Sequence, residues 1–323
     1  MSATNIVIRR PGLRMPTFVL IGLMALSVGC ARRFPEPEVT TIKADNPAQL
    51  QRYLLSGKPD VAQFRLRGPF AVVARKDLEI PVASGLTVTA DLYLCAAATR
   101  APLVIMLHGH DNSKADHAFQ AMHLASWGMH SLALGLPNRG PWIGNGRTLA
   151  RLVDAIRRTP QLLDGRIEAN KIILVGHSFG ATAVAAALGE RAAAIGGILL
   201  DPAGIGRELR QLLERIALPV MIIGADEDIR PTRNRGQFYR YIARAVAEIS
   251  IRDTHHEDAQ YPKIHILRGF EDDPDDSEEA QIAFVSALTA SAFGLATTGT
   301  IDYGWNSFEN AIKTGMFFNA RRK

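Results

Sequence analysis

The sequence has few of the features that mark a specialised protein class. Its 323 residues hold only two cysteines, Cys30 and Cys95, so the sequence implies no framework of disulfides. The apolar segment at residues 16–28 is shorter than the roughly 20 residues that a transmembrane helix needs. No internal repeat is visible. These absences argue against a disulfide scaffold and a repeat architecture.

The sequence also has only a small excess of positive over negative charge. The formal net charge is +5, and subtracting the three arginines of the first 29 residues leaves +2. A value so small, without a basic stripe interleaved with aromatic residues, argues against a nucleic-acid partner. The hydrophobic content of 47% is that of an ordinary globular protein. The length allows one α/β domain with a full core.

The first thirty residues are typical of a secretory signal. A start with three arginines precedes the apolar segment 16–28. Residues 26–30 (LSVGC) resemble a bacterial lipobox, although Ser27 stands where leucine is usual. The resemblance implies that Cys30 is lipidated and becomes the mature N-terminus. We therefore expect an exported protein, anchored to a membrane of the bacterial envelope and facing the periplasm or the exterior. Plain secretion, an uncleaved anchor and a cytoplasmic protein are the alternatives.

The chain divides into three expected segments: a lipoprotein-type signal peptide (1–29), a tether and N-terminal segment (30–67), and a globular domain (68–323). Within that domain apolar strands alternate with helices. The expected strands are 70–78, 86–95, 102–107, 129–134, 171–175, 196–200, 219–223 and 248–251. The expected helices are 115–127, 147–163, 181–188, 208–216, 237–247 and 281–293, and the basic tail 319–323 is expected to fray. This alternation predicts a mostly parallel sheet of about eight strands with helices on both faces.

The most informative motif is residues 176–180, Gly-His-Ser-Phe-Gly. It follows one expected strand and precedes an alanine-rich helix, which is the context of a nucleophile elbow. The serine of an elbow occupies a strained turn, so its neighbours two residues away must be small, as Gly176 and Gly180 are. The helix N-terminus then directs free N–H groups at the reaction centre. The motif predicts Ser178 as a nucleophile.

A serine hydroxyl is a weak nucleophile, so it needs a base, and the base needs an orienting carboxylate. In a doubly wound hydrolase sheet the chain order is serine, acid, histidine. The strand 219–223 is followed by Asp226, Glu227 and Asp228, any of which suits the acid. The strand that ends at Ile251 is followed by His255 and His256. These two side chains cannot face the same way, so one is the candidate base.

Two N–H groups are needed to stabilise the oxyanion. One is expected from Phe179, directly after the nucleophile, and the other from His110, in the loop after the strand 102–107. The histidines 108, 110, 117 and 123 invite comparison with metal sites. Their spacing matches no zinc motif, and no cysteine or acidic ligand pattern accompanies them. We therefore predict neither a metal nor a cofactor.

These residues resemble the α/β-hydrolase superfamily. The resemblance rests on residues 107–109 (LHG), 124–129 (LASWGM) and 176–180, and it covers about residues 68–315. It is closest to the branch of bacterial cutinases and of chlorophyllase-like, platelet-activating-factor-acetylhydrolase-like and dienelactone-hydrolase-related enzymes. It implies an α/β-hydrolase fold with a Ser-His-Asp triad.

The resemblance also ranks the candidates. Residues 224–228 (GADED) resemble the cutinase acid loop, in which the second aspartate is catalytic, so Asp228 is preferred to Asp226 and Glu227. The loop is one residue shorter before Pro231, which keeps Asp226 as the alternative. Residues 256–258 (HED) resemble the H-x-D that follows the last strand, which favours His256 over His255.

The stretch between the strand 196–200 and Pro219 is too short for a large lid, so we expect an open cleft. Residues 201–203, including Pro202, and Trp142 are expected to line it. The predicted function is a serine hydrolase that cleaves small or polymeric carboxylic esters through an acyl-enzyme. The alternatives are a cofactor-independent acyltransferase and a non-catalytic envelope lipoprotein that binds through this fold. No protein partner is implied.

Overall fold

The structure is a computed structural model that describes residues 38–204, 206–226, 235–262 and 278–323. Residues 37–323 form one compact unit. The expected signal peptide and the expected lipidation site, Cys30, lie outside the described residues.

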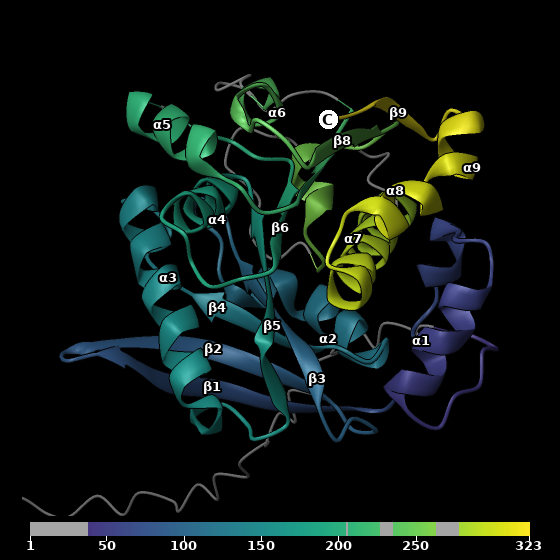
Figure 1. Ribbon diagram of the computed structural model, residues 1–323, viewed down its shortest axis with the longest axis horizontal. Coiled ribbons are helices and arrows are strands. Elements are labelled where there is room, and N and C mark those ends of the chain that lie inside the picture. Colours follow the sequence, from purple (N-terminus) through teal and green to yellow (C-terminus); the bar gives the residue numbers. More distant parts are fainter. Residues whose placement is uncertain (1–37, 205, 227–234, 263–277) are drawn as a thin grey trace, which may run out of the picture. The chain divides into compact units, whose positions relative to one another are not determined.

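The described part of this unit is built on one nine-stranded sheet (Figure 1). Its strand order is β1-β2-β4-β3-β5-β6-β7-β8-β9, and the six central strands from β4 to β8 are parallel. The outer strands β1, β2 and β9 are antiparallel to their neighbours. The strands are β1 Val72–Ala83, β2 Leu86–Cys95, β3 Ala101–Leu107, β4 His130–Gly135, β5 Ile167–His177, β6 Gly196–Leu200, β7 Val220–Gly224, β8 Val246–Ile251 and β9 Phe317–Arg322.

Helices cover both faces of the sheet, with α3, α4 and α5 on one side in Figure 1 and α1, α2 and α7 on the other. The helices are α1 Pro47–Ser56, α2 Ala118–Ser126, α3 Trp142–Arg158, α4 Phe179–Gly189, α5 Arg207–Arg215, α6 Gly236–Tyr241, α7 Glu278–Thr298, α8 Asp302–Ser307 and α9 Glu309–Lys313. Short 3₁₀ turns lie at Val61–Phe64 (η1), Lys114–His117 (η2), Pro160–Leu162 (η3) and His256–Ala259 (η4). This is the predicted mostly parallel, two-faced architecture.

The core consists of two hydrophobic clusters, one on each face of the sheet. Along β3, Val104 and Met106 belong to one cluster, while Leu103, Ile105 and Leu107 belong to the other. Successive side chains of a strand point to opposite faces, so a strand that is buried on both faces reads as a continuous apolar run. The run at 102–107 is therefore the sequence signature of a central strand.

One described helix, α7, is long and apolar enough to cross a membrane. In this fold it is a core helix, because 89% of its apolar window is buried inside the molecule. Its Phe284 and Leu288 are fully buried in the core. A helix that is hydrophobic all round is expected in such a position.

Two local predictions were wrong. The expected helix 237–247 ends at Tyr241, and Val246 already belongs to β8. The tail expected to fray forms β9, where Phe317 pairs with Ile251 and is 1% exposed. Its ring also meets that of Phe308, at 5.3 Å between centroids. Both differences arise because partners distant in sequence decide the conformation, and local propensity is weak against tertiary packing.

The described part of the segment 30–67 packs onto the domain. Its helix α1 begins at Pro47, next to the capping residue Asn46. Leu50 of α1 and Phe64 of η1 are buried in the same core as α7. The ring centroids of Phe64 and Trp127 lie 4.8 Å apart. Residues from 38 onward therefore contribute to the stability of the domain.

Candidate active site

Ser178 lies in a strained turn between β5 and α4. Its φ of 55° and ψ of −127° are unfavourable for a residue that has a Cβ atom. The flanking glycines are required by close contacts: a Cβ at Gly176 would lie 2.5 Å from the carbonyl oxygen of Gly180, and one at Gly180 would lie 2.3 Å from that of His108. The turn therefore has the geometry that the elbow motif predicts.

The loop after β3 reaches the serine. A Cβ at Gly109 would lie 2.7 Å from the Cβ of Ser178, so only glycine allows this approach. The next residue, His110, has its ring 6.1 Å from that of Phe179, measured between centroids. Trp142, at the start of α3, stacks on Phe179 at 5.7 Å with an interplanar angle of 17°. The structure thus brings His110, Phe179 and Trp142 together beside Ser178.

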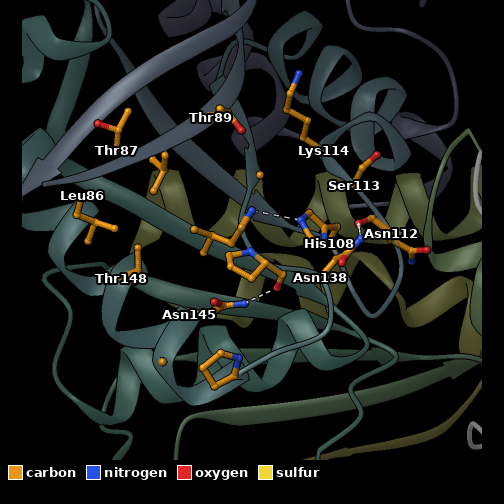
Figure 2. A pocket seen from close by; sticks show the side chains of 16 residues that line it. Leu86, Thr87, Thr89, His108, Asn112, Ser113, Lys114, Asn138, Asn145 and Thr148 are labelled. Carbon is orange, nitrogen blue, oxygen red and sulfur yellow. Dashed lines mark hydrogen bonds between the residues drawn. The ribbon is translucent and has the colours of Figure 1, made fainter.

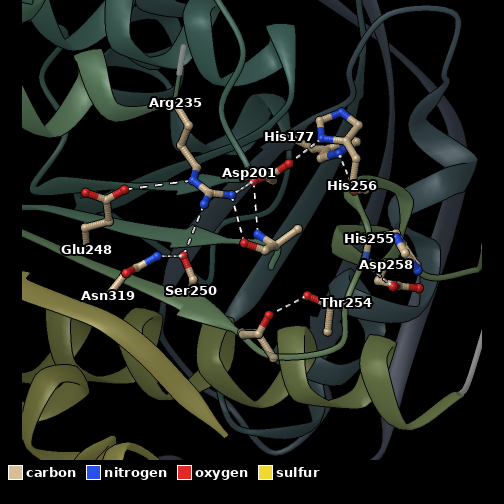
Figure 3. A network of polar contacts seen from close by, with 12 residues as sticks. His177, Asp201, Arg235, Glu248, Ser250, Thr254, His255, His256, Asp258 and Asn319 are labelled. Atoms are coloured by element: carbon tan, nitrogen blue, oxygen red, sulfur yellow. Dashed lines mark hydrogen bonds and ion pairs between the residues drawn. The ribbon is translucent and has the colours of Figure 1, made fainter. Parts of the chain in front are cut away.

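His256 and Asp201 form a buried pair. Nδ1 of His256 donates to Oδ2 of Asp201 across 2.5 Å (Figure 3). Asp201 directly follows β6, and His256 begins η4 after β8. The other ring nitrogen of His256, Nε2, is buried and has no hydrogen-bond partner among the described residues. A histidine held through Nδ1 with Nε2 available has the form of a general base.

The pair shifts both pKa values. Burial acts to raise the pKa of Asp201, but the hydrogen bond and charge of His256, and the charge of Arg235, hold it well below its usual range. Burial acts to lower the pKa of His256, but the hydrogen bond and charge of Asp201 outweigh it and raise the pKa above its ordinary value. Asp201 is therefore an ionised partner that favours the charged imidazole.

The candidates for the acid and the base fall in different places. Asp228 and Glu227 lie outside the described residues. Asp226 accepts from the N–H of Asp253 at 2.8 Å, so it contacts the turn after β8. His255 is exposed, and its N–H donates to Asp258.

The carboxylate that meets His256 is Asp201, a residue that the sequence places only in the expected cleft wall, next to Pro202. Pro202 is buried. The available signal for Asp201 was its place directly after the apolar strand 196–200, at the carboxyl edge of the sheet.

A second histidine, His177, packs against His256 with its ring tilted by 39°. The ring of His177 lies 4.5 Å from that of His256, and its Nε2 donates to the backbone carbonyl of His256 at 3.1 Å. Burial, with the nearby His256 and His117, lowers the pKa of His177 well below its ordinary value. His177 therefore favours the neutral form and packs as a polar wall behind His256.

His108 is held in one tautomer. Its Nδ1 donates to the carbonyl of Gly109 at 3.0 Å, and its Nε2 accepts from the N–H of Leu136 at 3.3 Å. Over the described ranges, no three side chains of His, Cys, Asp or Glu are grouped so that they could hold a metal ion. The described histidines of this region are thus engaged in protein contacts.

A cavity of about 730 Å³ opens near the site, at the carboxyl ends of β3 and β4 (Figure 2). Its walls come from the start of β2, the loops after β3 and β4, and the start of α3. They include His108, Asn138 and Thr148, but neither Ser178 nor His256. The cavity adjoins the turn at Ser178, because its wall residue His108 precedes Gly109, which packs on Ser178. Its volume is in the range of small-molecule sites.

The comparison with protein families agrees with this geometry. A model of the alpha/beta hydrolase family matches residues 104–307, more than half of the chain. The chain therefore belongs to the alpha/beta hydrolase family, and the matched region holds Ser178, Asp201 and His256. Membership indicates a hydrolase that acts on a small-molecule substrate. A search of curated proteins finds no match.

Proposed function

We propose that this protein is a serine hydrolase that cleaves carboxylic esters through an acyl-enzyme. The observation that carries the proposal is the buried His256–Asp201 pair, 2.5 Å apart, in a fold that also places Ser178 in a strained elbow. A strained nucleophile, an oriented base and an ionised acid are the three parts that this chemistry needs.

In the first step Oγ of Ser178 attacks the ester carbonyl, and Nε2 of His256 takes the serine proton. The oxyanion is stabilised by the N–H groups of Phe179 and His110. The tetrahedral intermediate collapses, and His256 returns the proton to the leaving alcohol. Water then attacks the acyl-enzyme with His256 again as base, and the acid is released while Ser178 recovers its proton.

We assign the acid role to Asp201 rather than to Asp228. Asp201 accepts from Nδ1 of His256, so it fixes the tautomer that leaves Nε2 available to the serine. It also stabilises the imidazolium that forms during the attack.

We place the part of the substrate remote from the scissile bond in the cavity beside β4. Its wall residue His108 precedes Gly109, which packs on Ser178. One loop therefore joins the cavity to the serine. The polar lining is mostly amides and hydroxyls, which include Asn138, Asn145 and Thr148. Such a lining suits a neutral ester with polar oxygen atoms.

The decisive experiment is labelling by a fluorophosphonate probe, combined with hydrolysis of p-nitrophenyl esters. We expect the wild type to be labelled and to turn over ester, and Ser178→Ala to lose both. Ser56→Ala, which changes an exposed serine, is the matched control and should behave as wild type. A folded wild-type protein without labelling or turnover would instead favour a binding role for this fold.

The location of the protein is a separate proposal. We propose that Cys30 carries a lipid anchor in the bacterial envelope, because residues 1–30 have the order of a lipoprotein signal. Metabolic labelling with an alkyne fatty acid should mark the wild type and not Cys30→Ser. Labelling of both proteins to the same extent would exclude this anchor.

A further inference from the structure

The catalytic carboxylate of the proposed triad has a second partner. Nη1 of Arg235 donates to Oδ1 of Asp201 at 2.5 Å, on the oxygen that His256 does not use. The same nitrogen donates to the carbonyl of Ala225, and Nη2 donates to Oγ of Ser250. The side chain of Arg235 is 8% exposed. The guanidinium is thus built into the interior against the acid (Figure 3).

Orientation of Asp201 does not by itself require a buried cation. The backbone N–H of Ala225 already donates to Oδ1 of Asp201 at 3.0 Å. Burying an arginine costs free energy unless its charge is compensated. The buried guanidinium of Arg235 must therefore be compensated by other charges and must serve more than the orientation of Asp201.

The compensation is a chain of alternating charge that crosses the sheet. Nε of Arg235 lies 3.9 Å from Oε1 of Glu248 on β8. Oε2 of Glu248 accepts from Nε of Arg321 on β9 at 2.7 Å. The carboxyl-terminal strand therefore supports, through Glu248, the arginine that contacts Asp201. This chain is neutral as a whole, which offsets the cost of its burial.

The charge of Arg235 has a consequence for the base. An ionised Asp201 with no cation at its second oxygen would favour the imidazolium form of His256 strongly. A histidine that is already protonated cannot accept the proton of Ser178. Arg235 opposes this, because its charge acts to lower the pKa of His256.

Resting on the proposed triad, we propose that Arg235 is a positioning residue: it fixes Asp201 through Oδ1 and offsets part of the negative charge that His256 meets. His256 is thereby held in place and loses its proton more readily than it would beside Asp201 alone. Arg235 touches neither substrate nor reacting atoms and acts only through Asp201.

Other groups also face the pair. Glu257, in the same turn as His256, acts to raise the pKa of His256. His177 faces the ring from β5, with His117 behind it, and both pKa values are lowered, chiefly by burial. Glu248 faces Arg235 from β8. The test must therefore separate the charge of Arg235 from these contributions.

The test uses three variants of the full chain. Arg235→Gln removes the charge, Arg235→Lys keeps it with a different shape, and Arg147→Gln removes an exposed arginine whose partners are Glu190 and Glu208. The pKa of His256 is measured by NMR on ¹⁵N-histidine-labelled protein, with the signal assigned from His256→Gln. The pH profile of kcat/KM on a short ester is measured in parallel.

We expect Arg235→Gln to raise the pKa of His256 by about one unit, which moves the acid limb of kcat/KM to higher pH. At about pH 6 this lowers kcat/KM roughly fivefold more than at about pH 8. Arg235→Lys should restore the pKa most of the way, and Arg147→Gln should leave it unchanged. A fall in activity that is equal at every pH, with the pKa of His256 unmoved, would show that Arg235 only supports the fold.

Because Arg235→Gln could fail to fold, a second variant is included for which the expected shift in the pKa of His256 has the opposite sign. Thermal melting confirms that each variant is folded. Glu248→Gln keeps Arg235 but removes its counter-charge, so the pKa of His256 should fall. A rise or no change overturns the proposal. The NMR measurement needs no turnover, so it decides the role of Arg235 even if the wild type hydrolyses no ester. That last result would count against the proposed function alone.

Discussion

His256 meets Asp201 at the carboxyl edge of the sheet, with 2.5 Å between Nδ1 and Oδ2. Asp201 follows β6, and Ser178 follows the neighbouring strand β5. Neighbouring strands are about 4.8 Å apart, so residues that follow adjacent parallel strands are brought close by the sheet itself. His256 reaches the same edge from η4. This turn follows β8, which lies two strands beyond β6 in the sheet.

This relationship predicts which acid matters. Asp201→Asn should lower kcat by about 10³-fold or more, because the amide favours the wrong tautomer of His256 and cannot stabilise its charge. Asp228→Asn should retain nearly full activity. Both are measured as kcat on a p-nitrophenyl ester, with thermal melting to confirm folding. Loss of activity in Asp228→Asn with retention in Asp201→Asn would reverse the assignment.

The close packing of the elbow predicts a stability effect at Gly180. In Gly180→Ala the new methyl group meets the backbone carbonyls of Leu107 and His108 at 2.5 and 2.3 Å, and backbone cannot give way as a flexible side chain can. We expect a loss of about 2 kcal/mol or more in the free energy of unfolding, measured by urea denaturation. Gly165→Ala, where nothing lies within 4 Å, is the matched control and should cost little.

The buried histidines predict a loss of stability in acid. Burial lowers the pKa values of His117, His123 and His130 to about 4, from about 6.5 in the unfolded chain. Between these values the unfolded state binds more protons, so the free energy of unfolding falls as the pH drops from about 6.5 to about 4. His177, whose pKa is also lowered by burial, adds to this effect, whereas His256, whose pKa is raised, acts in the opposite sense as one group against four.

Calorimetry across this pH range measures the effect as a falling Tm. Replacing His130 by phenylalanine should remove about one proton from the uptake on unfolding and make the pH dependence less steep. A Tm that is constant between about pH 6.5 and 4 would show that these side chains are not neutral and buried in solution.

The cavity predicts a change in substrate preference. Thr148 lies on its wall, and Thr148→Trp fills part of it. If the remote part of the ester occupies this space, KM rises for long or bulky esters and stays unchanged for short ones, because the reaction centre is untouched. Thr148→Ser is the matched control. Equal KM values for all esters in both variants would exclude the cavity as a substrate subsite.

The sequence by itself determined what depends on local pattern. The apolar runs at 102–107 and 196–200 are strands because each side chain finds a core on one face or the other. The elbow also follows from local sequence, since Gly176 and Gly180 must be small for the turn to close. The alternation of strands and helices, a mostly parallel sheet covered on both faces, and the tight turn at Ser178 were therefore predictable.

Only the tertiary structure decided which distant groups meet. His256 lies 55 residues from Asp201 in the chain, and no local pattern states which of several strand-end carboxylates it will face. The tail forms β9 because Phe317 finds a buried place beside Phe308, and Arg321 there reaches Glu248. Such pairings depend on long-range packing and on compensation of buried charge, which the whole fold determines and no short stretch of sequence contains.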